Sequence, residues 1–355
     1  MAIADANDLE LGIDTFGDVT NGPDGQPLPY GQVIRNVVEE GVLADHVGVD
    51  AITIGEHHRD DFAVSAPDVV LAAIAARTER IRIGSGVTVL SSDDPIRVFQ
   101  RFATIDAISN GRADVIMGRG SFTESFPLFG YALQDYQTLF EEKLNLYAEV
   151  QKEQPVTWQG STRAPLQNQM VYPTTESGAL RTWVGVGGSP ESVVRAANYG
   201  FPLMLAIIGG PAERFVPFVE LYHRALTQLE QPWQPVGVHS PGYIADTDEQ
   251  AMDELWPAYE QMFGRIGRER GWGPTTYAHF QQEVEHGSLY VGSPETVARK
   301  IAATVSALGI QRFDLKYSTG PLQHEKLMHA IELYGTQVIP RVRELLAERL
   351  VPAGA

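Results

Sequence analysis

The stretch Ala51-Ile-Thr-Ile-Gly-Glu-His-His-Arg-Asp-Asp61 decides the fold that we expect for this chain. It begins as a short apolar run of strand type and then opens abruptly into the polar and charged residues from Glu56 to Asp61. An apolar strand that ends in such a cluster is typical of the carboxyl edge of the sheet in an α/β enzyme. We therefore expect functional side chains at this edge.

Seven further segments resemble short strands and alternate with segments of helical periodicity. The expected strands are residues 9–16, 51–55, 81–90, 112–117, 182–186, 202–208, 236–244 and 311–317. This alternation predicts an α/β fold, a single (β/α)8 TIM barrel in which residues 1–355 form one domain. An open Rossmann sheet is the alternative, but no Gly-x-Gly-x-x-Gly motif opens the helix after the first strand.

Two segments are longer than the barrel pattern requires. Residues 152–181 show little periodicity and contain several prolines, and residues 246–290 exceed one helix and are expected to hold two or more. Because long loops without regular structure are usually functional, we expect residues 152–181 on the active-site side. Both are interpreted as insertions at the C-terminal face of the strands.

The composition excludes several classes of function. The chain has no cysteine, which excludes disulfides, thiolate metal sites and a cysteine nucleophile. Its formal net charge of −18 argues against nucleic acid and anionic membranes as partners. No signal peptide is recognisable and no apolar run approaches the ~18 residues of a membrane span, so we expect a cytoplasmic protein.

Two elements at the expected strand ends suit an anionic group. In Gly187-Gly-Ser-Pro-Glu-Ser192, Gly188 lets the backbone approach a ligand, Ser189 can cap a helix and Pro190 fits its first position. The free amides of such a helix start suit a phosphate, although a plain capped helix gives the same pattern. Arg119, between two glycines after the fourth strand, is a candidate anion partner at the barrel mouth.

His57 and His58 are the candidates for acid–base chemistry. On extended backbone neighbouring side chains point to opposite sides, so only one of them readily faces the barrel mouth. A zinc site is the rival interpretation, because Glu56, Asp60 and Asp61 are further possible ligands.

Several short motifs occur in an order and spacing that indicate a known family. They are Glu56-His-His58, Asp94-Pro-Ile-Arg97, Asp106-Ala-Ile-Ser-Asn-Gly-Arg112, Gly118-Arg-Gly120, Phe129-Gly130, Ala196-Ala-Asn-Tyr-Gly-Phe-Pro202 and Val291-Gly-Ser-Pro-Glu295. With them the chain resembles, over nearly its whole length, the bacterial luciferase-like family of flavin-dependent monooxygenases. The resemblance implies a (β/α)8 barrel with reduced FMN at the carboxyl ends of the strands, and a mobile lid for which residues 246–290 are the candidate.

The resemblance also implies roles for individual residues. His57 resembles the histidine that serves catalysis in luciferase. Arg119, Ser189 and Ser192 resemble the contacts to the cofactor phosphate. Gly86 and Val87 lie where the family often has a non-prolyl cis peptide bond beside the flavin ring, and Ser121 resembles a backbone contact to that ring.

Two departures from luciferase stand out. A second phosphate-binding arginine of luciferase falls near Gln137 here, and an aspartate of its mobile region falls near Ser125, with Glu124 beside it. Light emission is therefore not implied, and the substrate is not inherited from luciferase.

The function implied is oxidation of a small organic substrate by reduced FMN and O2. The expected partners are an NAD(P)H:flavin reductase and a second copy of the chain in a homodimer. The alternatives are a deazaflavin-dependent hydride-transfer enzyme on the same fold, a non-catalytic flavin-binding protein and a metal-dependent hydrolase.

Overall fold

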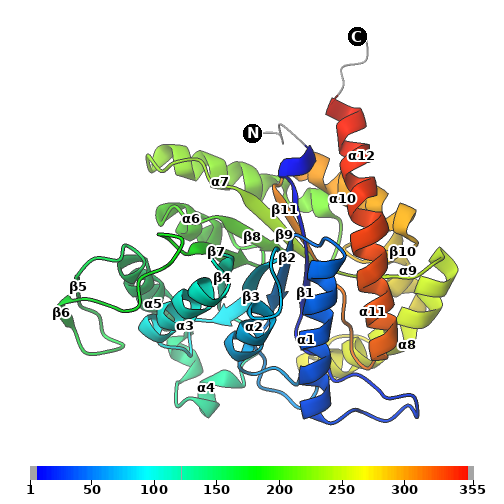
Figure 1. The fold of residues 1–355 in the computed structure, drawn as a ribbon, viewed down its shortest axis with the longest axis horizontal. Helices are drawn as coiled ribbons and strands as arrows, with labels where there is room; N and C mark the ends of the chain where they lie inside the picture. The colour runs from blue at the N-terminus through cyan, green and yellow to red at the C-terminus, as the bar shows by residue number, and fades with distance from the viewer. Residues whose placement is uncertain (1–5, 121, 351–355) are drawn as a thin grey trace.

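The computed structural model describes residues 6–120 and 122–350. In this part of the chain eight parallel strands close into a barrel surrounded by helices (Figure 1). In barrel order they are β1 (Glu10–Thr15), β2 (Ala51–Ile54), β3 (Arg82–Val89), β4 (Ala113–Gly118), β7 (Arg181–Val186), β8 (Leu203–Ala206), β9 (Val236–Ile244) and β11 (Arg312–Lys316). The pairings of β11 with β1 and β9, and of β8 with β9, close the ring. The predicted (β/α)8 barrel is confirmed.

The helices form the outer layer around this barrel. They are α1 (Tyr30–His46), α2 (Pro67–Ala75), α3 (Pro95–Ile108), α4 (Ser125–Leu128), α5 (Tyr136–Val150), α6 (Pro190–Asn198), α7 (Val216–Gln228), α8 (Asp248–Arg270), α9 (Tyr277–His286), α10 (Pro294–Leu308), α11 (His324–Leu333) and α12 (Ile339–Leu350). A short strand β10 (Tyr290–Gly292) pairs with the end of β9. Proline starts α2, α3, α6 and α10, where its missing N–H is not needed for the helix.

Residues 152–181 do not lie where the sequence analysis expects them. They contain a β-hairpin, β5 (Val156–Trp158) and β6 (Leu166–Gln169), outside the helix layer beside α5 (Figure 1). The indole N–H of Trp158 donates to Asn145 Oδ1 of α5 at 2.8 Å, and the segment contributes no residue to the cavity described below. Burial of its few apolar side chains against the helices holds this segment on the outer side of the barrel, away from the expected active-site side.

Charged side chains fill the barrel interior near the amino ends of the strands. They are Glu10, Arg82, Asp114, Arg181, Arg312 and Asp314. Arg312 is 1% exposed and donates to Asp114 at 2.7 Å and to Asp314 at 2.9 Å. Arg181 donates to the same Asp114 oxygen, Oδ2, at 2.7 Å and to Oδ1 at 3.0 Å, and it forms a two-pronged pair with Glu10. The three arginines around Asp114 hold the pKa of its carboxyl group far below its usual value.

An apolar cluster lies next in the interior, and of the charged side chains below it only Asp314 also borders the cavity at the barrel mouth. Ile116, Trp183 and Met204 pack together there, with Val87 against them. Gly237 makes room for this cluster, because a Cβ at that position would lie 2.7 Å from Met204 Cε. The barrel is therefore solid at its amino end and open only at the carboxyl ends of the strands.

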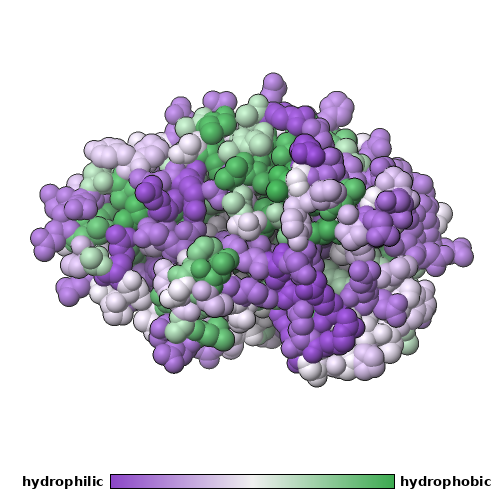
Figure 2. Space-filling model, turned by 90° about the horizontal axis from the view of Figure 1, so that it is seen from below, coloured by the Kyte–Doolittle hydropathy of each residue, from purple (hydrophilic) through white to green (hydrophobic). Residues whose placement is uncertain are grey.

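The surface at the carboxyl end of the barrel is mixed in character. Seen from below, hydrophilic residues cover most of this face and hydrophobic residues form separate patches (Figure 2). Within residues 6–120 and 122–350, no helix has the length and apolar character needed to span a membrane.

Replacing Arg312 with methionine tests the charged layer. The variant keeps the side-chain bulk but takes one counter-charge from the fully buried Asp114 and Asp314. We expect it to lower the free energy of unfolding by about 3–5 kcal/mol, measured by urea denaturation at neutral pH. The control is Arg341→Met on α12, where the ion pairs to Glu295 and Glu344 are at the surface. Equal losses in the two variants would contradict this role for the layer.

Candidate active site

The carboxyl ends of the strands border a cavity of about 380 Å³. Its lining is mostly apolar and includes Phe16, Phe62, Phe122, Ile116 and Met204. Met262, Phe263 and Ile266 of α8 also border it, so the insertion 246–290 reaches this site. Its two helices, α8 and α9, agree with the prediction for that segment. A cavity with such walls suits a flat, largely apolar ligand.

The backbone of β3 changes course where it borders the cavity. The peptide bond between Gly86 and Val87 is cis, as the family resemblance predicts, and the pairing with β4 shifts register there. A Cβ at Gly86 would lie 2.5 Å from Asp14 Oδ1 and 2.8 Å from Thr53 Oγ1. Only glycine therefore fits beside these two side chains.

His57 follows β2 and packs its ring among aromatic side chains. The ring centroids of Phe16 and Phe62 each lie 4.5 Å away, and that of Phe122 lies at 5.1 Å. His57 is 8% exposed, and this desolvation lowers its pKa from 6.5 to about 3. The imidazole is therefore neutral at pH 7.

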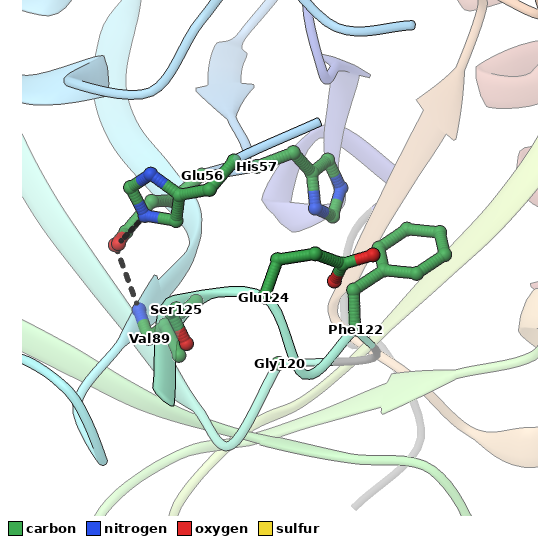
Figure 3. Close-up of a pocket in the computed structure, with 8 residues that line it drawn as sticks. Glu56, His57, Val89, Gly120, Phe122, Glu124 and Ser125 are labelled. Atoms are coloured by element: carbon green, nitrogen blue, oxygen red, sulfur yellow. Dashed lines mark hydrogen bonds and ion pairs between the residues drawn. The ribbon is translucent and has the colours of Figure 1, made fainter. Parts of the chain in front are cut away.

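His58 and Glu56, on either side of His57 in the chain, bind each other. His58 Nε2 lies 2.8 Å from Glu56 Oε1, and the other carboxylate oxygen accepts the Val89 N–H at 3.0 Å (Figure 3). Of the two histidines, His57 alone borders the large cavity. The described part of the chain brings together no group of three His, Asp or Glu side chains suited to a metal ion.

The first turn of α6 and the loop after β4 form a pocket that fits an anion. Ser189 caps α6 by accepting the Ser192 N–H at 3.2 Å, and the two hydroxyl groups lie 2.9 Å apart. Gly188, just before the cap, has a positive φ of 110°, which glycine adopts readily. Arg119 stacks over the Tyr136 ring at 5.1 Å. Ser192 and Arg119 both line the cavity.

Arg195 is a residue of this pocket that sequence reasoning missed. Its guanidinium group donates to Ser192 Oγ at 3.4 Å and to Glu141 at 2.8 Å. Gln137 bonds both Glu141, at 2.6 Å, and Arg119, at 3.2 Å. A continuous chain of contacts thus joins the two arginines. Arg195 reaches back to Ser192 because helical side chains lean toward the amino end of their helix. The three-residue spacing from Ser192 is the sequence signal that would have revealed Arg195.

A second pair that sequence reasoning did not join lies beside Gly86. His239 Nδ1 is 3.5 Å from the fully buried Asp14 Oδ2, and Thr53 donates to the other oxygen of Asp14 at 2.5 Å. Burial raises the Asp14 pKa well above its usual value and lowers the His239 pKa to about 3. His239 is therefore uncharged near neutral pH, and it borders the cavity.

The predicted backbone contact of Ser121 lies outside the residues that the structure describes. The other predicted residues, His57, Gly86, Val87, Arg119, Gly188, Ser189 and Ser192, lie at or beside this one cavity. Their roles toward a ligand stay predictions.

A model of the luciferase-like monooxygenase family matches residues 11–312. The chain belongs to this family. The family prediction is confirmed, and with it the prediction of an enzyme. Among its luciferase-like relatives, the alkanal monooxygenase alpha chain of Photobacterium leiognathi is 22% identical over 338 residues, which cover 88% of this chain and 94% of the relative.

Solved structures share the luciferase-like barrel. The oxygenating constituent of 3,6-diketocamphane monooxygenase from Pseudomonas putida, a type II Baeyer-Villiger monooxygenase in complex with FMN, superposes with a TM-score of 0.77 at 19% identity. The alignment covers 96% of this chain and 99% of that one. An F420-dependent secondary alcohol dehydrogenase in complex with an F420-acetone adduct gives a TM-score of 0.72 at 17% identity, over 94% and 99% of the chains. The shared fold thus serves two kinds of cofactor.

His57 predicts how stability depends on pH. Its folded-state pKa of about 3 lies below the ordinary 6.5, so between these values the unfolded chain binds a proton that the folded chain does not. This effect is absent above pH 6.5, and it destabilises the fold progressively as the pH falls toward 3. His57→Gln should therefore lose less stability than wild type on acidification, by up to about 1.4 kcal/mol per pH unit. Urea denaturation between pH 7 and pH 5 measures this, and parallel stability curves would contradict it.

Proposed function

We propose that this protein is the oxygenase component of a two-component flavin monooxygenase, which uses reduced FMN and O2 to oxidise a small organic substrate. The observation that carries the proposal is the joining of an anion pocket, built around Arg119, Arg195 and the start of α6, to an apolar cavity that His57 borders. One end suits a phosphate and the other a flat ring system.

The residues of the anion pocket fit a dianionic phosphate. The first-turn amides of α6 and the Ser189 and Ser192 hydroxyl groups offer hydrogen bonds, and Arg119 and Arg195 offer positive charge. Glu141 offsets part of the Arg195 charge. The cis bond at Gly86–Val87 presents backbone to the apolar cavity, where the ring would lie. The FMN-bound relative of the same fold supports this assignment.

Bound reduced flavin would supply the electrons that activate O2. The protein's part is to orient the ring and substrate, to exclude water with the aromatic walls and to handle a proton. His57 is the group that we assign to pass this proton through its ring nitrogens, because it borders the cavity. Phe16, Phe62 and Phe122 hold its ring in place.

The same fold supports an alternative, hydride transfer with a deazaflavin, since an F420-dependent dehydrogenase shares the barrel. Anaerobic spectroscopic titration with reduced FMN and with reduced F420 separates the two. Tight binding of F420 with no binding of FMN would replace our proposal, and FMN binding without O2 consumption would favour a flavin-binding protein.

We further propose a separate NAD(P)H:flavin reductase, a homodimer and a cytoplasmic location.

Arg195→Gln tests the phosphate assignment. Losing a charge-assisted bond to phosphate should weaken FMN binding roughly ten- to a hundredfold and leave riboflavin binding unchanged. Fluorescence titration with both ligands measures this. Arg224→Gln, at an exposed position of α7, is the control. Gln137→Arg added to Arg195→Gln should restore part of the FMN affinity, because it returns a cation beside Arg119. An equal loss for both ligands would contradict the assignment.

His57→Ala tests the proton role. The variant should bind FMN as wild type does but form product roughly a hundredfold more slowly, with reduced flavin oxidised to hydrogen peroxide instead. His58→Gln is the matched control, because His58 follows in the chain and lies off the large cavity. Product yield and peroxide per reduced FMN are the measurements. Unchanged coupling in His57→Ala would remove His57 from the mechanism.

A further inference from the structure

His57 separates the large cavity from a second, much smaller one. The small cavity has a volume of about 10 Å³, and His57, Glu124, Ser125 and Val89 are among its lining residues (Figure 3). This volume matches the space needed for the centre of one water molecule. Four residues border both cavities and so lie between them, namely Glu56, His57, Gly120 and Phe122.

Three of the side chains around the small cavity each have a buried polar atom that finds no hydrogen-bond partner in the described chain. The atoms are His57 Nε2, Glu124 Oε2 and Ser125 Oγ. His57 is 8% and Ser125 4% exposed, so bulk water does not satisfy these atoms. Buried polar groups in native proteins are usually bonded to protein or to ordered water. Three such atoms around a space of this size form a water-binding site.

Glu124 connects this site to the surface. Its Oε1 accepts from Arg59 at 2.9 Å, and its side chain is 37% exposed although Oε2 is buried. Figure 3 shows the Glu124 carboxylate turned toward His57 and Phe122. Arg59 in turn binds Glu269 of α8 at 2.8 Å and Asp61 at 2.9 Å. These two ion pairs fix the Arg59 guanidinium group, which in turn holds the Glu124 carboxylate in this position.

We propose that one water molecule in the small cavity links His57 Nε2 to Glu124, and that this path exchanges the proton of His57 with solvent. An imidazole takes up a proton on one ring nitrogen and releases the proton of the other, so His57 can pass a proton between the two cavities without turning. The released proton moves to the water, and the water gives one to Oε2 of Glu124. Rotation of the half-exposed Glu124 carboxyl group then brings this oxygen to solvent, where the proton leaves.

We call this path from His57 through one water molecule to Glu124 the relay. Its use in turnover rests on the proposed function, whereas its existence can be tested without a cofactor. The charged groups that act on His57 are Asp18, Lys316, His58 and Arg59. Glu56, which also borders the cavity, is already bonded to His58 and the Val89 N–H. Glu124 is therefore the carboxylate with a free buried oxygen on this path among the described residues. It acts through water and His57, as a positioning and relay residue.

Glu124→Gln tests the relay, because glutamine keeps an oxygen for Arg59 but does not transfer a proton. Glu269→Gln is the matched control: it removes charge from the same arginine, and Glu269 borders neither cavity. In cofactor-free protein with 15N-labelled histidine, Glu124→Gln should slow exchange of the His57 ring N–H with solvent about tenfold or more, while Glu269→Gln leaves it unchanged. His57→Gln assigns the signal.

A crystal structure of the cofactor-free protein gives the second readout. We expect one ordered water within hydrogen-bond distance of His57 Nε2 and Glu124 Oε2. An empty cavity, or equal exchange in wild type and Glu124→Gln, overturns the relay whether or not the protein proves to be an oxygenase.

With reduced FMN and a substrate, Glu124→Gln should lower kcat about tenfold at unchanged KM. Failure of wild type to consume O2 with reduced FMN would refute the proposed function alone.

Discussion

The buried charge layer at the amino end of the barrel is the constraint on which the rest of the structure depends. Asp114 of β4 binds arginines from β3, β7 and β11, so one carboxylate ties together strands that lie far apart in sequence. An unpaired charge there would be costly, and each arginine must therefore sit at one position along its strand. This requirement matches the register that the parallel pairings show, in which Asp114 lies opposite Arg181. The layer also plugs the barrel, so a ligand reaches the interior only from the carboxyl end.

The properties of the site follow from this one-sided opening. The apolar cluster of Ile116, Trp183 and Met204 lies between the mouth and most of the charges below, and Asp314 alone of that layer reaches the cavity. Above it, aromatic rings pack around His57 and remove its hydration, which lowers its pKa and keeps it neutral. The same packing leaves Nε2 without a partner in the described chain and places a water-sized space behind it. Desolvation thus disfavours a lasting positive charge on His57, so a proton that this ring takes up on one nitrogen must leave from the other.

The proposed anion pocket differs in its charged residues from the one that the resemblance to luciferase implies. Where luciferase has an arginine, this chain has Gln137, and the structure brings Arg195 of α6 to the same cluster. The helix start provides amides and a capping serine in either case, since these depend on backbone geometry alone. The positive charge at a phosphate site depends on where the charged end of a side chain lies. An arginine on α5 or one on α6 can therefore supply charge to the same pocket.

The sequence by itself determined the eight strands, the capped start of α6 and the family, and it predicted a role for His57. These features rest on local signals, namely periodicity, proline and serine at helix starts, and charge at a strand end, which the structure leaves intact. Only the tertiary structure decided the outer position of residues 152–181, the place of Arg195 beside Ser192, and the meeting of Glu124 with His57 and Arg59. Each of these depends on which helix packs against which, because contacts between distant segments are set by burial and charge pairing across the whole barrel.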